Sequence, residues 1–175
     1  MTTSSPDDNA ALVTGASGDI GAALTRQTAT DGYDFVLTAQ RERRLTALAQ
    51  ELEEDHGVTT TIIPKDLADP GAPPELFKEV RNAGIDVHTL VNVAGFPVYG
   101  RFNDTPIEEE LEMMQVNVVA LTHLTKLFAE PWSNAGTARF LMWPHSRPAH
   151  QCRDSPSMRQ PKPTCYRSPR RGPRT

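Results

Sequence analysis

The chain has 175 residues, the length of one ordinary domain, and 38% of them are hydrophobic and 23% charged. This composition excludes a chain that is disordered throughout, and no apolar run approaches the roughly 18 residues that a membrane span needs. Segment 1–9 is polar and acidic, unlike a signal peptide, and two cysteines, Cys152 and Cys165, cannot make a disulfide framework. We therefore expect a cytoplasmic protein with a flexible segment 1–9 and no membrane partner.

The net charge of −4 is divided unevenly along the chain. Residues 1–143 hold 10 Lys and Arg against 21 Asp and Glu, whereas residues 144–175 hold 8 against 1 and contain 7 of the 15 prolines. The few apolar residues of the second segment follow neither helical nor strand periodicity, so they cannot offset the entropy of ordering it. We expect a globular domain at 10–143 and a disordered, basic tail at 144–175 that is rich in proline and arginine.

The first half of the domain alternates apolar strands with amphipathic helices. Apolar and β-branched runs predict strands at 10–13, 35–39 and 58–64. Helical periodicity and glycine stop signals predict helices at 20–30, around the leucines of 45–52, and at 75–83. Each predicted helix thus joins two predicted strands.

The second half continues the same alternation. Residues 87–93 predict a fourth strand and residues 138–143 a fifth. Between them lies the helix around 106–128, whose start is predicted from a capping box of Thr105 and Glu108. Strict alternation places helices on both faces of a parallel sheet. The expected fold class is therefore α/β, an incomplete, Rossmann-like, doubly wound parallel sheet of about five strands.

A glycine-rich turn, Thr-Gly-Ala-Ser-Gly-Asp-Ile-Gly at 14–21, joins the first strand to the first helix. Glycines allow the backbone to approach a pyrophosphate closely, and the helix N-terminus favours its negative charge. The alternative is a strand–helix turn that binds no ligand. The strand–turn–helix context favours a dinucleotide site. Its candidate contacts are Gly15, Ser17, Gly18, Ile20 and Gly21.

Four motifs in order resemble the short-chain dehydrogenase/reductase family over about residues 10–143. They are the turn at 14–21, Asp66-Leu67 after the third strand, Asn92-Val93-Ala94-Gly95 after the fourth, and Asn117 in the helix around 106–128. The resemblance implies the doubly wound fold and an oxidoreductase that transfers hydride between NAD(P)(H) and an alcohol or carbonyl group. The further cofactor contacts that it implies are Asp66, Leu67, Asn92, Ala94 and Gly95.

The resemblance also implies individual roles for two of these residues. Asp66 would contact the adenine ring, and Asn117 would support catalysis. A carboxylate that shapes the turn after a strand is the alternative interpretation of Asp66.

Two residues depart from the family pattern. Asp19 stands where the family has the middle glycine of the turn, and Val93 replaces the second Asn of Asn-Asn-Ala-Gly. A carboxylate at position 19 would repel a pyrophosphate, or it would cap the first helix.

The end of the second strand bears on the choice of cofactor. An acidic residue there would bind the ribose 2′-hydroxyl and exclude NADP. The sequence instead continues with Gln40, where family members that prefer NADP often have Arg, and then Arg41. Arg41, with Arg43 and Arg44, could bind a 2′-phosphate or could form a solvated helix start. We expect NADP(H) in preference to NAD(H).

The resemblance further implies a catalytic Ser after the fifth strand and a Tyr-x-x-x-Lys pair on the next helix, where the lysine lowers the pKa of the tyrosine. The sequence instead places Ser146 in an unrelated context, and Tyr166 is followed four residues later by Arg170. We therefore expect this chain to be catalytically incompetent, a truncated member of the family whose reading frame shifts at the end of the match.

Some features of the sequence bear on other functions. A non-catalytic module would bind the nicotinamide dinucleotide or form a homo-oligomer through the helix around 106–128, although core packing also explains the apolar spacing of that helix. A nucleic-acid arm is not expected, because the basic tail has little aromatic interleaving and no recognition motif. No metal is expected either, because the His and Cys residues of 144–175 lack zinc-site spacing.

Overall fold

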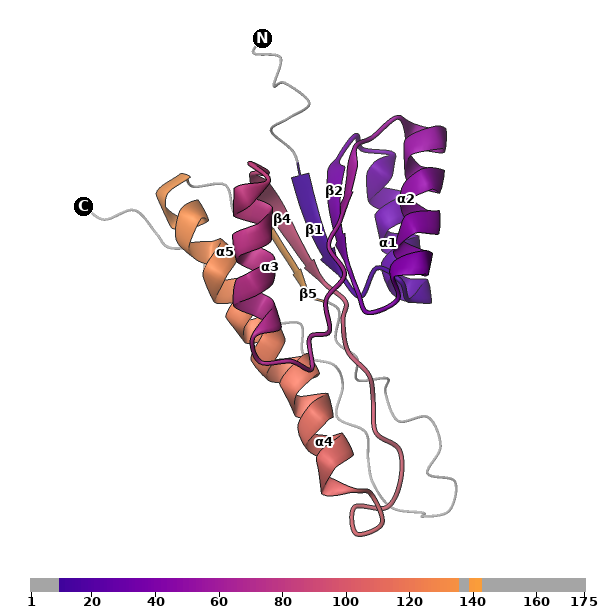
Figure 1. Ribbon diagram of the computed structural model, residues 1–175, viewed down its shortest axis with the longest axis vertical. Helices are drawn as coiled ribbons and strands as arrows, with labels where there is room; N and C mark the ends of the chain where they lie inside the picture. Colours follow the sequence, from indigo (N-terminus) through magenta and orange to yellow (C-terminus); the bar gives the residue numbers. More distant parts are fainter. Residues whose placement is uncertain (1–9, 136–138, 143–175) are drawn as a thin grey trace, which may run out of the picture.

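The computed structural model describes residues 10–135 and 139–142. Their strands form one parallel sheet in the order β3-β2-β1-β4-β5 (Figure 1). The strands are β1 (Ala10–Thr14), β2 (Asp34–Thr38), β3 (Thr60–Ile62), β4 (Val87–Asn92) and β5 (Arg139–Met142). The flexible segment and the disordered tail expected at 1–9 and 144–175 lie outside the described residues.

Helices cover both faces of the sheet. Helices α1 and α2 lie on one face and α3 and α5 on the other, while α4 projects beyond the end of the sheet (Figure 1). The helical segments are α1 (Asp19–Ala29), α2 (Glu42–His56), α3 (Ala72–Asn82), α4 (Ile107–Met114), the π-helical turn η2 (Gln115–Ala120) and α5 (Leu121–Ala135). The predicted doubly wound α/β fold is therefore confirmed. None of the described helices is long and apolar enough to span a membrane.

The central strand β1 is apolar on both of its faces because both faces are covered. Ala11 and Val13 belong to the core cluster beneath α1 and α2, whereas Leu12 belongs to the cluster beneath α3 and α5. Successive side chains of a strand point to opposite faces, so the sequence of a strand that is buried on both faces is a continuous apolar run. This packing fixes the carboxyl end of β1 in the interior of the molecule, next to that of β4.

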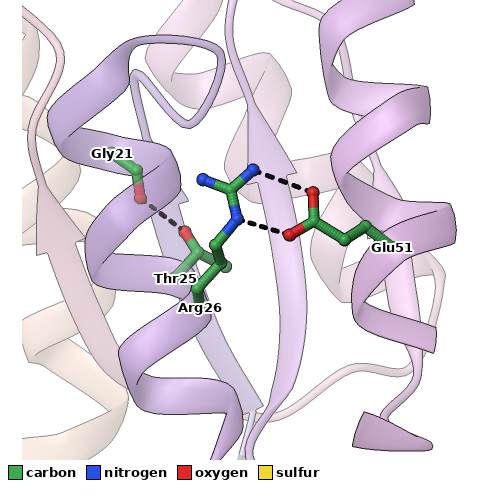
Figure 2. Close-up of polar contacts among 4 residues, drawn as sticks. All are labelled: Gly21, Thr25, Arg26 and Glu51. Carbon is green, nitrogen blue, oxygen red and sulfur yellow. Dashed lines mark hydrogen bonds and ion pairs between the residues drawn. The ribbon is translucent and has the colours of Figure 1, made fainter. Parts of the chain in front are cut away.

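Polar contacts hold α1 against its neighbours (Figure 2). The guanidinium of Arg26 donates two hydrogen bonds to the Glu51 carboxylate of α2, at 2.5 and 2.8 Å. This pairing raises the pKa of Arg26 and lowers that of Glu51. On the buried side, the Thr25 hydroxyl donates to the Gly21 carbonyl at 2.7 Å. This second bond lies within α1, so of the two contacts only the Arg26–Glu51 pair joins α1 to another element.

The predicted start of the helix around 106–128 is wrong in detail. Pro106 is the N-cap with an extended backbone, so the helix begins at Ile107, one residue later than a Thr105 cap requires. Glu108 is then out of register for a capping box, and the Thr105 hydroxyl hydrogen-bonds the Glu110 carboxylate instead. The predicted single helix is also divided into α4 and α5 by η2.

We expect Leu90→Ala to lower the free energy of unfolding by about 2–5 kcal/mol, because Leu90 is fully buried in the inner strand β4 and its truncation leaves a cavity. Phe102→Ala removes a larger apolar side chain that is 84% exposed, so its effect should stay within about 0.5 kcal/mol. Denaturant unfolding of both variants measures the difference. Equal destabilisation by the two variants would contradict this account of the core.

Candidate functional site

A cavity of about 470 Å³ lies at the carboxyl ends of the strands. At this edge of the sheet the chain connections diverge. The chain continues from β1 through α1 to β2 on one side, and from β4 through α5 to β5 on the other. Ligands of doubly wound sheets bind in the crevice where the connections diverge in this way. The lining comes from the turn after β1 and the first residues of α1, the segments that follow β2 and β3, the loop after β4, and Val116 of η2.

Most of the residues predicted to contact the cofactor are brought together here. Those that line the cavity are Gly15, Ser17, Gly18, Ile20, Gly21, Arg41, Asp66, Leu67, Ala94 and Gly95. Asn92 and Asn117 are not among the lining residues. Asn92 is only 1% exposed, and its side-chain amide donates to the Thr125 hydroxyl at 3.3 Å, so it lies behind the cavity wall.

The turn after β1 and the loop after β4 are joined by the hydroxyl of Thr14. This fully buried oxygen accepts hydrogen bonds from the backbone N–H groups of Val93 and Ala94, both at 3.1 Å. The next residue, Gly15, has φ +68°, and a Cβ there would lie 2.8 Å from the backbone of Ala94. The floor of the cavity thus requires glycine for both its backbone conformation and its close packing.

The N-terminus of α1 forms one end of the cavity. Gly18 is the N-cap and offers no capping side chain, and the first N–H groups of any helix have no partner within it. A Cβ at Gly21 would lie 2.3 Å from the Gly15 carbonyl oxygen, so α1 starts directly against the turn. This arrangement of N–H groups and helix dipole is suited to a phosphate. Asp19 is the first residue of α1 rather than its cap, and it is also among the residues that line the cavity.

The loop after β4 is held by the side chain of Asn117. Its oxygen accepts from the backbone N–H of Phe96 at 3.0 Å, and its nitrogen donates to the carbonyl of Phe96 at 2.9 Å. Asn117 belongs to η2, whose neighbouring residue Val116 lines the cavity together with Phe96. In this structure the predicted support residue therefore fixes one wall of the cavity.

Arg41 and Lys65 line the cavity and Arg44 contacts the glycine-rich turn beside it, and these three cationic side chains differ in their partners. Arg41 and Arg44 each donate to the Ser17 carbonyl at 3.4 Å. Lys65 instead forms ion pairs with Glu75 at 2.9 Å and Glu79 at 2.8 Å, which raise the pKa of its ammonium group. Within the described residues, no carboxylate pairs with Arg41 or Arg44, so these guanidinium groups are available to an anionic ligand.

The carboxylate of Asp66 has both local and distant partners. Its Oδ1 accepts from the backbone N–H of Ala68 at 2.9 Å, which is the turn-forming contact of the alternative interpretation of Asp66. The same oxygen accepts from the side-chain amide of Gln40 at 2.8 Å. Asp66 and Gln40 both line the cavity, so the turn contact does not remove Asp66 from the site.

Several residues of this site were not predicted from the sequence. Thr14, Gln40, Lys65 and Phe96 were not among the predicted contacts, although each follows or ends a predicted strand. Their positions after the carboxyl ends of parallel strands could have indicated that these residues belong to the site. Among the described residues there is no group of three or more His, Cys, Asp or Glu side chains that could hold a metal ion.

The family model of the short chain dehydrogenases matches residues 9–141, so this chain belongs to that family. Curated relatives include the 7beta-hydroxysteroid dehydrogenase of Collinsella aerofaciens, which is 33% identical over 122 residues, or 67% of this chain and 46% of the relative. The sulfoacetaldehyde reductase 2 of Chromohalobacter salexigens is 34% identical over 115 residues, or 65% of this chain and 45% of the relative. The chain thus spans about half the length of the curated relatives that it matches.

Solved structures show the same likeness. A short-chain dehydrogenase from Sphingobium yanoikuyae in complex with NADPH aligns with a TM-score of 0.72 and 30% identity over 77% of this chain and 52% of the other. An alcohol dehydrogenase from the archaeon Thermococcus sibiricus, complexed with 5-hydroxy-NADP, also gives a TM-score of 0.72, with 31% identity over 77% of this chain and 57% of the other. Both comparisons support the fold and the family assignment.

We expect Gly15→Ala to disturb the cavity more than Gly57→Ala does. Both glycines have positive φ, at +68° and +66°, but only the Cβ at position 15 would meet another backbone within 4 Å. Gly57→Ala should cost about 1 kcal/mol of stability from the left-handed conformation alone. Gly15→Ala should cost more because the loop at Ala94 must also move. Chemical denaturation of the two variants measures the difference, and equal losses would contradict the close packing of turn and loop.

Proposed function

We propose that this chain binds NADP(H) in the cavity at the carboxyl ends of β1 and β4. The proposal rests on one end of the cavity. There the glycine-rich turn after β1 leads into the N-terminus of α1, which has no side-chain cap. N–H groups and the helix dipole there favour the pyrophosphate. Apolar lining residues such as Leu67 and Val116 offer surfaces for the rings of the cofactor. The NADPH and NADP complexes of similar structures support the same ligand class.

The phosphorylated cofactor is favoured over NAD(H) by the guanidinium groups beside the turn. Among the described residues, the side chains of Arg41 and Arg44 hydrogen-bond the Ser17 carbonyl at 3.4 Å and pair with no carboxylate, whereas Lys65 forms ion pairs with two carboxylates. A guanidinium recognises a phosphate with paired N–H donors. A 2′-phosphate bound near the end of β2 would therefore find two cations that no carboxylate neutralises.

We also propose that the chemistry of this family, hydride transfer between the cofactor and an alcohol or carbonyl group, is not completed by the 175-residue chain alone. The proton-transferring Tyr and its Lys partner would have to stand four residues apart on one helical face. None of the three tyrosines, Tyr33, Tyr99 and Tyr166, is followed by lysine at that spacing. The chain therefore contains a cofactor cavity without the paired groups that transfer the proton.

A titration that follows cofactor fluorescence tests this function. We expect saturable binding of NADPH that is tighter than binding of NADH. Arg41→Ala should weaken NADPH binding by about tenfold, the worth of one charged hydrogen bond, and should leave NADH binding nearly unchanged. With simple aldehydes and ketones, the same sample should consume no NADPH above the rate of a blank.

The matched control is Arg43→Ala, because Arg43 carries the same charge two residues further along, in the first turn of α2, but does not line the cavity. Equal weakening by Arg41→Ala and Arg43→Ala would assign the effect to general charge rather than to a phosphate contact. Absence of NADPH binding would overturn the proposed function, and steady consumption of NADPH would overturn the proposed lack of turnover.

A second function, self-association, is favoured by the exposed apolar side chains of α4 and η2. Ile107, Leu111, Met114 and Val118 are 52–57% exposed, and their spacing places them on one helical face. An exposed apolar stripe of this kind is typical of a protein–protein contact. We propose that a second copy of the chain covers it.

We expect sedimentation analysis to show a dimer of the wild-type chain and a monomer of Leu111→Glu, because a charge in the stripe would have to be desolvated on association. Glu112→Gln is the matched control on α4, since it lies outside the apolar stripe and should leave the dimer intact. A monomeric wild-type chain at all concentrations would contradict self-association without affecting the cofactor proposal.

A further inference from the structure

Two exposed aromatic side chains lie in the loop between β4 and α4. Tyr99 is 79% exposed and Phe102 is 84% exposed. Aromatic side chains are enriched in protein contacts, because each ring buries a large apolar area. The turn that carries Phe102 is ordered, since the Arg101 carbonyl accepts from the backbone N–H groups of Asp104 at 2.8 Å and Thr105 at 3.2 Å. The loop therefore presents its rings on a defined backbone.

Carboxylates adjoin these rings at the start of α4. The helix has four glutamates and no lysine or arginine, and Glu108, Glu109 and Glu112 are exposed. Among the described residues, none of these three forms an ion pair. The Thr105 hydroxyl donates to the Glu110 carboxylate, which holds the turn against the start of the helix. The aromatic–acidic patch thus comprises Tyr99, Phe102, Glu108, Glu109 and Glu112.

One segment of the same chain has the complementary composition. Residues 144–175, the basic segment, hold 8 Lys and Arg against 1 Asp and Glu, and they contain 7 of the 15 prolines. Arginine forms paired hydrogen bonds with carboxylates. Proline-rich peptides dock on aromatic side chains, because proline restricts the backbone before binding. The patch therefore offers a partner to both residue types in which the basic segment is rich.

The sheet brings the start of the basic segment to the patch side of the molecule. Strands β4 and β5 are parallel neighbours, and Asn92 is paired in register with Met142. The loop that carries Tyr99 follows Asn92, and residues 143–175 follow Met142, so both leave the same end of the sheet. Helix α4 projects beyond that end (Figure 1). Residues 143–175 would span about 100 Å when extended, whereas α4 is about 12 Å long, so the patch is within reach.

We propose that the basic segment docks on the aromatic–acidic patch of its own chain. Its arginines pair with the exposed glutamates of α4, and its prolines lie against Tyr99 and Phe102. Each exposed ion pair contributes little alone, but segment and patch belong to one chain, so a high effective concentration favours the contact. The patch excludes the apolar stripe of Ile107, Leu111, Met114 and Val118, and it does not line the cavity, so the inference does not depend on the proposed function.

The native cysteines allow a direct test in the full chain. Cys152 and Cys165 are the only cysteines of the sequence, and both lie in the basic segment. A thiol-specific nitroxide therefore labels that segment alone. Amide NMR spectra of the dilute, isotope-labelled chain are compared before and after the nitroxide is reduced. We expect the active nitroxide to remove the signals of Tyr99, Phe102 and Glu108 and to leave those of α2 at full intensity.

Helix α2 is the matched surface, because its Glu53, Glu54 and Asp55 are exposed carboxylates but it has no Phe, Tyr or Trp. Equal loss of signal over α2 would assign the effect to charge alone and overturn the proposal. Undiminished signals over the patch would overturn it as well.

Variants of the patch test the part played by the rings. The double variant Tyr99→Ala, Phe102→Ala should recover the Glu108 signal in the presence of the active nitroxide, and it should remain folded because both rings are exposed. The control Glu54→Gln, on α2, should leave the loss of the Glu108 signal unchanged. If that signal stays lost in the double variant, the rings do not hold the segment and the proposal is wrong.

A mixing experiment distinguishes the same chain from a second copy. An isotope-labelled chain with Cys152→Ser and Cys165→Ser, which carries no nitroxide, is mixed with the spin-labelled chain at natural isotope abundance. Its patch signals should keep their full intensity if each segment docks on its own chain. Their loss would assign the docked segment to a second copy and overturn the proposal.

Discussion

The close approach of the turn after β1 to the loop after β4 is the constraint on which the candidate site depends. One buried hydroxyl, that of Thr14, accepts from two consecutive N–H groups of the loop, and Gly15 packs against the same loop with no room for a Cβ. Because β1 and β4 are paired neighbours, this contact lies where the connections of the sheet diverge. The position of α1 follows from it, since Gly21 lies directly against Gly15.

Local donors rather than overall charge must attract an anionic cofactor to this site. Residues 1–143 carry 10 basic against 21 acidic side chains, so the long-range field of the domain is repulsive to a phosphate. Two arrangements offset this field near the cavity: the N-terminus of α1, and the guanidinium groups of Arg41 and Arg44 beside Ser17. Asp19 acts in the opposite direction from its place in the lining. The affinity for NADP(H) should therefore depend on the balance between these few groups.

The fold and most of the cavity lining could be predicted from the sequence because both follow from local patterns. Apolar periodicity identified the strands, and glycine spacing identified the turn at 14–21. The roles of Thr14 and Gln40 could not be predicted in this way. Their partners lie 79 and 26 residues away, and which atoms meet depends on how the strands are registered. The capping box failed for a related reason, since the extended backbone of Pro106 moved the helix start by one residue.

We place the dinucleotide where the turn after β1 meets the loop after β4. Amide NMR spectra of the isotope-labelled full chain, recorded as NADPH is added, test this claim most directly. We expect the signals of Gly15, Gly18 and Gly95 to shift in a saturable manner, and those of α4 at Ile107–Met114 to stay unchanged. Shifts confined to α4, or no shifts at all, would contradict the claim.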